Sequence, residues 1–137
     1  MANEVQRVRQ AIVALVTADA TLQTLCGRAS DLIRAPTQLG EAPLPMLVMG
    51  DPIWDSRSRQ MVVPLGAVAE DSAAAGANQT TQAMLAQLEV VLTAPGFHAQ
   101  GVEAAPVAFD RAPGEIDPEG SPTLTITEAT ATLLVLA

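Results

Sequence analysis

Hydrophobic residues recur every three to four positions over residues 4–17, which is the spacing of one face of an α-helix. The apolar positions of this segment are Val5, Val8, Ile12, Leu15 and Val16. Asn3 is a candidate N-cap for this helix, and Glu4 in the first turn would interact favourably with the helix dipole. Asp19 then opens a second, short helical segment that Gly27 can end as a left-handed residue. The pattern therefore predicts two consecutive helical segments at the start of the chain.

A longer helical pattern covers residues 78–93, with Gln82, Gln87 and Glu89 on its polar face. Its other face comprises Thr81, Met84, Leu85, Leu88, Val91 and Leu92. The dipeptide at 95–96, Pro followed by Gly, is a strong stop signal for a helix. We expect the apolar face of this helix to pack onto a sheet.

Apolar runs bounded by Pro, Gly and polar residues predict strands. The expected strands cover residues 31–34, 46–49, 60–69, 102–109 and 123–136. Because proline cannot donate a hydrogen bond to a neighbouring strand, Pro64 predicts that its strand lies at an edge or contains a bulge, and Pro106 weakens the next strand in the same way. In the last strand Leu124 and Ile126 alternate with threonines, so this segment is the better candidate for extending the sheet or facing another subunit.

The strands are grouped rather than strictly alternating with helices, and this order predicts the fold class. We expect an α+β fold, in which two amphipathic helices pack on one face of a mostly antiparallel, twisted sheet. The sequence contains no repeat of 20–50 residues and no linker. Residues 1–137 are therefore expected to form a single domain.

Composition and charge exclude several functional classes. The chain has 15 acidic residues, seven arginines and no lysine, so its net charge of −8 argues against binding to a nucleic-acid backbone. A single cysteine cannot form an internal disulfide. No apolar run reaches the length of about 18 residues that a membrane span needs, and the first ten residues do not have the pattern of a signal peptide. These features predict an acidic, intracellular protein without a membrane segment.

The sequence contains few groups that support catalysis. His98 is the only histidine and follows a Pro-Gly turn, which favours a surface loop over a catalytic position. Cys26, next to Leu25, has the context of a small buried hydrophobic residue, although Arg28 lies close enough in sequence to favour a thiolate. The chain has no phosphate-binding glycine motif and no nucleophile elbow, and its three aromatic residues do not form a sugar-binding pattern. We therefore expect a non-enzymatic protein that needs no cofactor.

One acidic segment matches part of a calcium-loop pattern. Its candidate ligands at positions 1, 3, 5, 7 and 12 are Asp117, Glu119, Ser121, Thr123 and Glu128. Position 6, where the loop requires glycine, is Pro122, and the flanking segments are predicted strands instead of helices. A solvated acidic loop is the favoured interpretation.

Order and spacing over about residues 5–136 resemble the tail-terminator, or tail-completion, proteins of long-tailed bacteriophages and gene-transfer agents. The resemblance begins with the N-terminal helix, followed by the turn at Asp19, spaced leucines, and Gly27. It continues with a proline-rich loop at 35–45 that leads into the strand at 46–49, and with the strand at 61–69 that leads to the long helix. It ends with the strand at 102–109, an acidic Asp-Pro-Glu-Gly loop at 117–120 and the C-terminal strand.

The resemblance implies a structural role in a virion. Proteins of this family form rings, typically of six subunits, on the head-proximal end of the tail tube. Such a ring stops tube polymerisation and joins the tail to the head-side connector, while DNA passes through the lumen without specific binding. The acidic balance of this chain suits a channel that does not retain DNA. The implied partners are further copies of the chain, the major tail-tube protein and the connector.

Charged positions are the candidates for contacts between subunits or with these partners. They are Arg57, Arg59, Asp110, Arg111, Glu115, Asp117 and Glu119. The arginines are natural partners for acids on a neighbouring subunit, and the acidic loop at 111–122 can set the register between subunits. Two other interpretations remain: another head-tail joining or head-completion protein of the virion, or a host-encoded α+β binding module.

Overall fold

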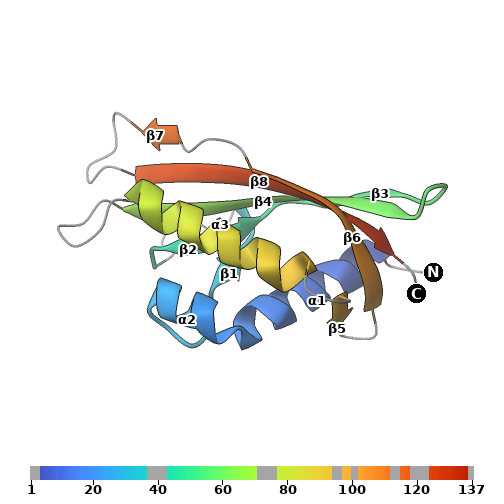
Figure 1. The fold of residues 1–137 in the computed structure, drawn as a ribbon, viewed down its shortest axis with the longest axis horizontal. Coiled ribbons are helices and arrows are strands. Elements are labelled where there is room, and N and C mark those ends of the chain that lie inside the picture. Colours follow the sequence, from blue (N-terminus) through green and yellow to red (C-terminus); the bar gives the residue numbers. More distant parts are fainter. Residues whose placement is uncertain are drawn as a thin grey trace.

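The computed structural model describes residues 4–36, 43–70, 77–93, 97–99, 102–111, 115–117 and 124–135. Within these ranges the chain has an α+β fold, with three helices on one face of an eight-stranded sheet (Figure 1). The helices are α1 (Glu4–Ala18), α2 (Ala20–Cys26) and α3 (Ala77–Thr93). The expected fold class is confirmed, and α2 is the short helical segment predicted between Asp19 and Gly27, which packs beside the two amphipathic helices.

The centre of the sheet consists of two long strands, β4 (Gln60–Glu70) and β8 (Leu124–Val135), which pair with each other. The other strands are β1 (Ile33–Arg34), β2 (Met46–Met49), β3 (Ile53–Asp55), β5 (Phe97–Ala99), β6 (Val102–Arg111) and β7 (Glu115–Asp117). The spatial order is β1-β2-β4-β8-β6-β5, with β3 also on β4 and β7 also on β8. Only the β1–β2 pair is parallel among the pairs of the described strands. Each central strand thus has a second neighbour made of two separate strands: the short β2 and β3 along β4, and the ten-residue β6 with the short β7 along β8.

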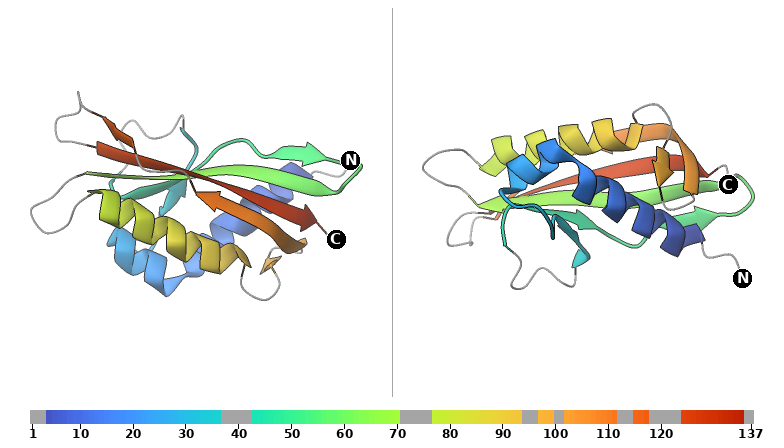
Figure 2. Two further views of the ribbon diagram at one scale, coloured as in Figure 1. Left: turned by 45° about the horizontal axis from the view of Figure 1, so that its top comes forward. Right: turned by 90° about the horizontal axis from the view of Figure 1, so that it is seen from below.

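The hydrophobic core lies between the helices and the inner face of the sheet (Figure 2). The fully or almost fully buried hydrophobic side chains of the helices are Val8, Ala11, Ile12, Val16, Leu22, Cys26, Met84, Leu85, Leu88 and Leu92. They face alternate residues of the central strands, which are Met61, Val63, Leu65, Ala67, Ala129, Ala131, Leu133 and Val135. The predicted apolar faces of α1 and α3 are therefore confirmed, with Val91 packed against the edge of the core.

Local capping determines the bounds of α2. Asp19 has an extended backbone, and its carboxylate accepts a hydrogen bond from the backbone N–H of Leu22 at 2.9 Å. Gly27 has a φ of 73° and ends the helix in the left-handed conformation. Both residues have the roles that the sequence predicts.

Pro64 does not lie on an edge strand, because β4 is central. The carbonyl of Pro64 accepts a hydrogen bond from the backbone N–H of Gly50 at 2.9 Å. A residue's nitrogen and carbonyl point to the same side of an extended strand, so the nitrogen of Pro64 also faces the break between β2 and β3 instead of β8. This break contains one residue more than the opposing part of β4. Of the two predicted alternatives, the edge position is wrong, whereas the extra residue opposite Pro64 is an irregularity of the bulge type. The missing donor is tolerated because it faces this irregularity.

The C-terminal strand is also central, so its prediction as a strand available to extend the sheet is wrong. β8 pairs with β4 along one side and with β6 and β7 along the other. The alternation of Leu124 and Ile126 with threonines would place the apolar residues of β8 on the buried face. In the structure Ile126 is instead exposed on the outer face, and Thr127 is buried. Pro106 of the neighbouring strand lies at a register shift, as expected for a proline in a ladder.

Candidate functional site

The hairpin between β3 and β4 carries Arg57 and Arg59 at one end of the molecule, beside the end of β8 (Figure 1). The backbone N–H of Arg57 donates to the carboxylate of Asp55 at 3.0 Å, and this bond and one from the Ser58 side chain lower the pKa of Asp55. These bonds hold the turn. The side chain of Arg57 is exposed and has no hydrogen-bonded or ionic partner within the described ranges.

Arg59 serves the fold of the same hairpin. Its backbone is left-handed, with a φ of 55°, and its Nε donates to the carbonyl of Val135 at 3.1 Å. The N–H of Val135 donates back to the carbonyl of Arg59 at 2.8 Å. The guanidinium also lies 5.7 Å from the centre of the Trp54 ring. Arg59 therefore ties the hairpin to the end of β8, whereas Arg57 projects without such contacts.

The other predicted interface residues lie elsewhere along the sheet. Arg111 of β6 reaches Glu89 of α3, with 3.7 Å between Nε and Oε1, and neighbouring Asp110 is exposed. Glu115 and Asp117 belong to β7, a strand that the sequence pattern placed inside a loop. Glu119 lies outside the described residues.

The hairpin arginines and β7 thus lie at opposite ends of β8, whereas Asp110 and Arg111 pair with the middle of this strand, at Thr130 and Ala129. Gln60 at the base of the hairpin pairs with Leu134, whereas Glu115 pairs with Ile126. Eight residues of extended chain separate these two positions, which corresponds to about 26 Å. One end of the sheet carries the arginine hairpin, and the other end carries the acidic strand β7.

The helix-free face of the sheet contains a shallow hollow of about 330 Å3 that the sequence patterns do not predict. We call it the outer groove, and its principal lining residues are Val48, Pro64, Gly66, Ile126, Glu128 and Thr130. Gly66 lies at its centre, where a Cβ atom would be 3.2 Å from the carbonyl oxygen of Thr127 and 3.9 Å from Cβ of Val48. The one signal in the sequence is a glycine inside a strand, which often marks a close approach.

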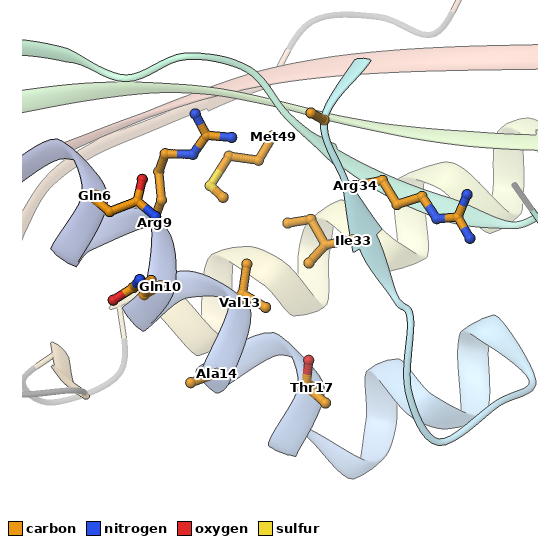
Figure 3. A pocket seen from close by; sticks show the side chains of 10 residues that line it. Gln6, Arg9, Gln10, Val13, Ala14, Thr17, Ile33, Arg34 and Met49 are labelled. Carbon is orange, nitrogen blue, oxygen red and sulfur yellow. The ribbon is translucent and has the colours of Figure 1, made fainter. Parts of the chain in front are cut away.

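A wider, open cleft of about 590 Å3 lies between α1 and the β1–β2 edge (Figure 3). Val13, Ile33 and Met49 form its apolar part. Two arginines border it, and each is paired with an acid: Arg9 with Asp51 at 2.9 Å, and Arg34 with Asp31 at 2.6 Å. Figure 3 shows the guanidinium of Arg34 pointing away from the cleft. The described residues of its lining include no carboxylate, histidine or cysteine.

The candidate catalytic and metal-binding residues are dispersed. Cys26 is buried, and this burial raises the pKa of its thiol, against the weaker opposing effect of the Arg28 charge. Arg28 itself donates to the carbonyls of Cys26, Asp31 and Pro45 at 2.7–3.0 Å, so it joins the end of α2 to the following loops. The backbone of His98 lies in β5 and not in a loop.

Two candidate ligands of the calcium-loop pattern, which the sequence disfavours, have described backbones: Asp117 on β7 and Glu128 on β8. Asp117 pairs with Leu124, and Glu128 lies four residues further along β8. The backbones of Asp117 and Glu128 are therefore about 13 Å apart along the strand. Glu119, Ser121 and Thr123 lie outside the described residues. Where the chain is described, no three His, Cys, Asp or Glu side chains lie close enough to hold a metal ion. Likewise, no helix in the described ranges is long and apolar enough to span a membrane.

Comparisons with known proteins give one informative similarity. The chain matches no protein-family model, and no curated protein is similar to it. Five chains of solved structures match, and one of them belongs to the virion of a native gene transfer agent particle. That chain has a TM-score of 0.62 and 14% identity, and the match covers 98% of this chain and 100% of the other. The two proteins therefore share a fold over nearly their whole lengths.

Proposed function

We propose that the protein is a structural component of a phage-like virion, and specifically a tail terminator. The observation that carries this proposal is the fold shared over the whole length of a gene transfer agent virion chain. The order of elements, which resembles that of tail terminators, supports the finer assignment. In this role copies of the chain form a ring, with six as the expected number, on the head-proximal end of the tail tube.

The distribution of charge suits a ring. A ring requires heterologous contacts, in which one surface of a subunit binds a different surface of the next. The free side chain of Arg57 and the acidic strand β7 lie at opposite ends of β8, so one end of a subunit is chemically complementary to the other end of its neighbour. We propose that Arg57, Asp110, Glu115, Asp117 and Glu119 contribute to contacts between subunits or with the partners.

The remaining partners follow from the capping role. One face of the ring would bind the last turn of the tail-tube protein, and the other face would bind the head-side connector. DNA would pass through an acidic lumen that repels its phosphates. Binding and assembly, without catalysis or a cofactor, are sufficient for this function.

Deletion of the gene in the producing strain, followed by electron microscopy, tests the proposal. Without a cap, tail tubes should exceed their normal length and fail to join heads, and the protein supplied in trans should restore both. Cryo-electron microscopy of intact particles should show a ring of this chain at the head–tail junction. Absence from that junction, or a single copy there, would contradict the terminator role.

The same experiment distinguishes the alternatives. A head-completion protein would lie on the portal side, and its deletion would leave free tails of normal length. A host-encoded binding module would be absent from purified particles. The shared fold with a virion chain favours the two virion roles over the host module.

A further inference from the structure

We propose that the outer groove of one copy receives the β3–β4 hairpin of a second copy, with Arg57 paired to Glu128. This inference rests on the proposed ring and identifies the two surfaces that join its subunits. It differs from the broader interface proposal, because neither Glu128 nor the outer groove belongs to the interface residues predicted from the sequence.

The outer groove is suited to an apolar segment that carries one cation. Its floor is formed by Val48, Pro64 and Gly66, and no helix covers this face of the sheet (Figure 2). Ile126 at its side is 41% exposed. Among the described lining residues Glu128 alone is charged, and it has no ionic partner within the described ranges. Ile126 also pairs with Glu115, so the backbone of the acidic strand β7 lies beside this position of β8.

The hairpin provides the matching chemistry. Ile53 on β3 is 66% exposed, the highest exposure among the large hydrophobic side chains of the described residues. Arg57 in the turn is the only arginine in the described ranges whose side chain has no interaction with the rest of the chain. The other six are engaged: Arg7, Arg9, Arg28, Arg34, Arg59 and Arg111. An exposed aliphatic side chain and an available cation therefore occur on the same hairpin.

A hairpin cannot occupy the groove of its own copy. Gln60 at its base pairs with Leu134, whereas Gly66 at the centre of the groove pairs with Glu128. These positions are six residues apart along rigid, paired strands, or about 20 Å. The donor and receptor surfaces are therefore separate, so each copy can give one hairpin and receive another. Such a heterologous contact can repeat until a ring closes.

Electrostatics makes this single pair important. Each copy has a net charge of −8, so copies repel one another unless opposite charges meet at the contact. Glu128 is exposed in the single copy, and a docked hairpin would cover it partly, so that its attraction to the guanidinium becomes stronger than on an open surface. The pair would thus select the direction in which subunits associate.

Charge reversal tests the contact with the full chain. We expect Arg57→Glu and Glu128→Arg each to raise the protein concentration needed for self-association at least tenfold, as measured by sedimentation velocity and native mass spectrometry. The double variant, Arg57→Glu with Glu128→Arg, should restore association because it exchanges the two charges. Glu103→Arg, an exposed change of equal charge on β6, serves as the control. Single variants that associate like wild type would overturn the contact, as would a wild-type chain that stays monomeric at millimolar concentration.

Disulfide trapping tests the direction of the contact. Arg57→Cys and Glu128→Cys are made as separate proteins and oxidised alone or mixed, with wild type as the blank because its Cys26 is buried. Cross-linked dimers should form in the mixture and not in either protein alone. Cross-links no more abundant than in wild type would overturn the proposed contact. If rings form at the head–tail junction but this cross-link does not, the contact is wrong and the terminator role stands. If the cross-link forms but the chain is absent from the head–tail junction, the contact stands and the terminator role is wrong.

Discussion

The hydroxyl groups of Thr81 on α3 and Thr127 on β8 are hydrogen-bonded at 2.8 Å, and both residues are fully buried. This bond joins the long helix to the central strand at a position where other helix–sheet contacts are apolar. It also matches the phase of β8 in which Thr127 points inward. Ile126 and Glu128 therefore point to the outer face, where they line the groove.

A double-mutant cycle measures this contact. Thr127→Val should reduce the free energy of unfolding by about 1 kcal/mol, because a buried hydrogen bond is lost with little change in shape. Combining it with Thr81→Val should cost less than the sum of the two single changes, by roughly 0.5–1.5 kcal/mol. Urea denaturation of the four proteins gives these values. Additive effects would show that the two hydroxyls do not stabilise each other.

The packing of α3 is tested by Leu88→Ala. Leu88 is fully buried between α3 and the sheet, so truncation should reduce the free energy of unfolding by about 2–5 kcal/mol. Val90→Ala is the matched control, since Val90 lies on the same helix and is 55% exposed; it should change stability by less than about 0.5 kcal/mol. A denaturation midpoint that Leu88→Ala leaves unchanged would refute the packing of this face.

Asp19 both caps α2 and joins it to α3. Its carboxylate accepts from the N–H of Leu22 at 2.9 Å and from the amide of Gln87 at 3.2 Å. Asp19→Ala should therefore reduce stability by about 1–2 kcal/mol in thermal or urea unfolding. Asp19→Asn keeps an acceptor for Leu22 and should lose much less. Equal losses for the two variants would indicate that the charge, and not the cap, is the stabilising feature.

Asp31 is expected to remain ionised at lower pH than an ordinary aspartate. The guanidinium of Arg34 makes two hydrogen bonds to its carboxylate, at 2.9 and 2.6 Å, and this contact lowers the pKa of Asp31. The associated stability is fully present above the ordinary aspartate pKa of about 3.9 and is lost as the pH falls through the lowered value. Carbon NMR titration should show the lowered pKa, and Arg34→Gln should raise it. Arg57→Gln, at the remote hairpin, should leave it unchanged.

Assembly should not require a metal ion, the lone histidine or the thiol. We expect His98→Ala, Cys26→Ala and excess EDTA to leave self-association unchanged, because the proposed contacts involve surfaces elsewhere on the sheet. The melting temperature with and without EDTA gives an independent readout. A melting temperature that is several degrees lower with EDTA would contradict this expectation and would support cation binding by the segment from Asp117 to Glu128.

The helices could be predicted from sequence because they depend on neighbouring residues. The spacing of apolar side chains over 78–93 identified the face of α3 that the structure buries. Asp19 and Gly27 identified the ends of α2, because a cap acts within one helical turn. Arg57 was also recognisable as an interface candidate, since arginine is scarce in this acidic chain.

The arrangement of the sheet was decided only by tertiary structure, because its paired strands lie far apart in sequence. Gln60 pairs with Leu134, and no local pattern indicates that these two segments would become the central strands. Alternation shows that two faces exist but does not show which face the helices cover, so the phase of Ile126 and Thr127 could not be assigned. The sequence by itself determined the helices and the charge of the hairpin, because both depend on residues that are close in the chain. The outer groove brings Gly66 beside Glu128 and exists only when β4 and β8 pair, so tertiary structure alone decided it.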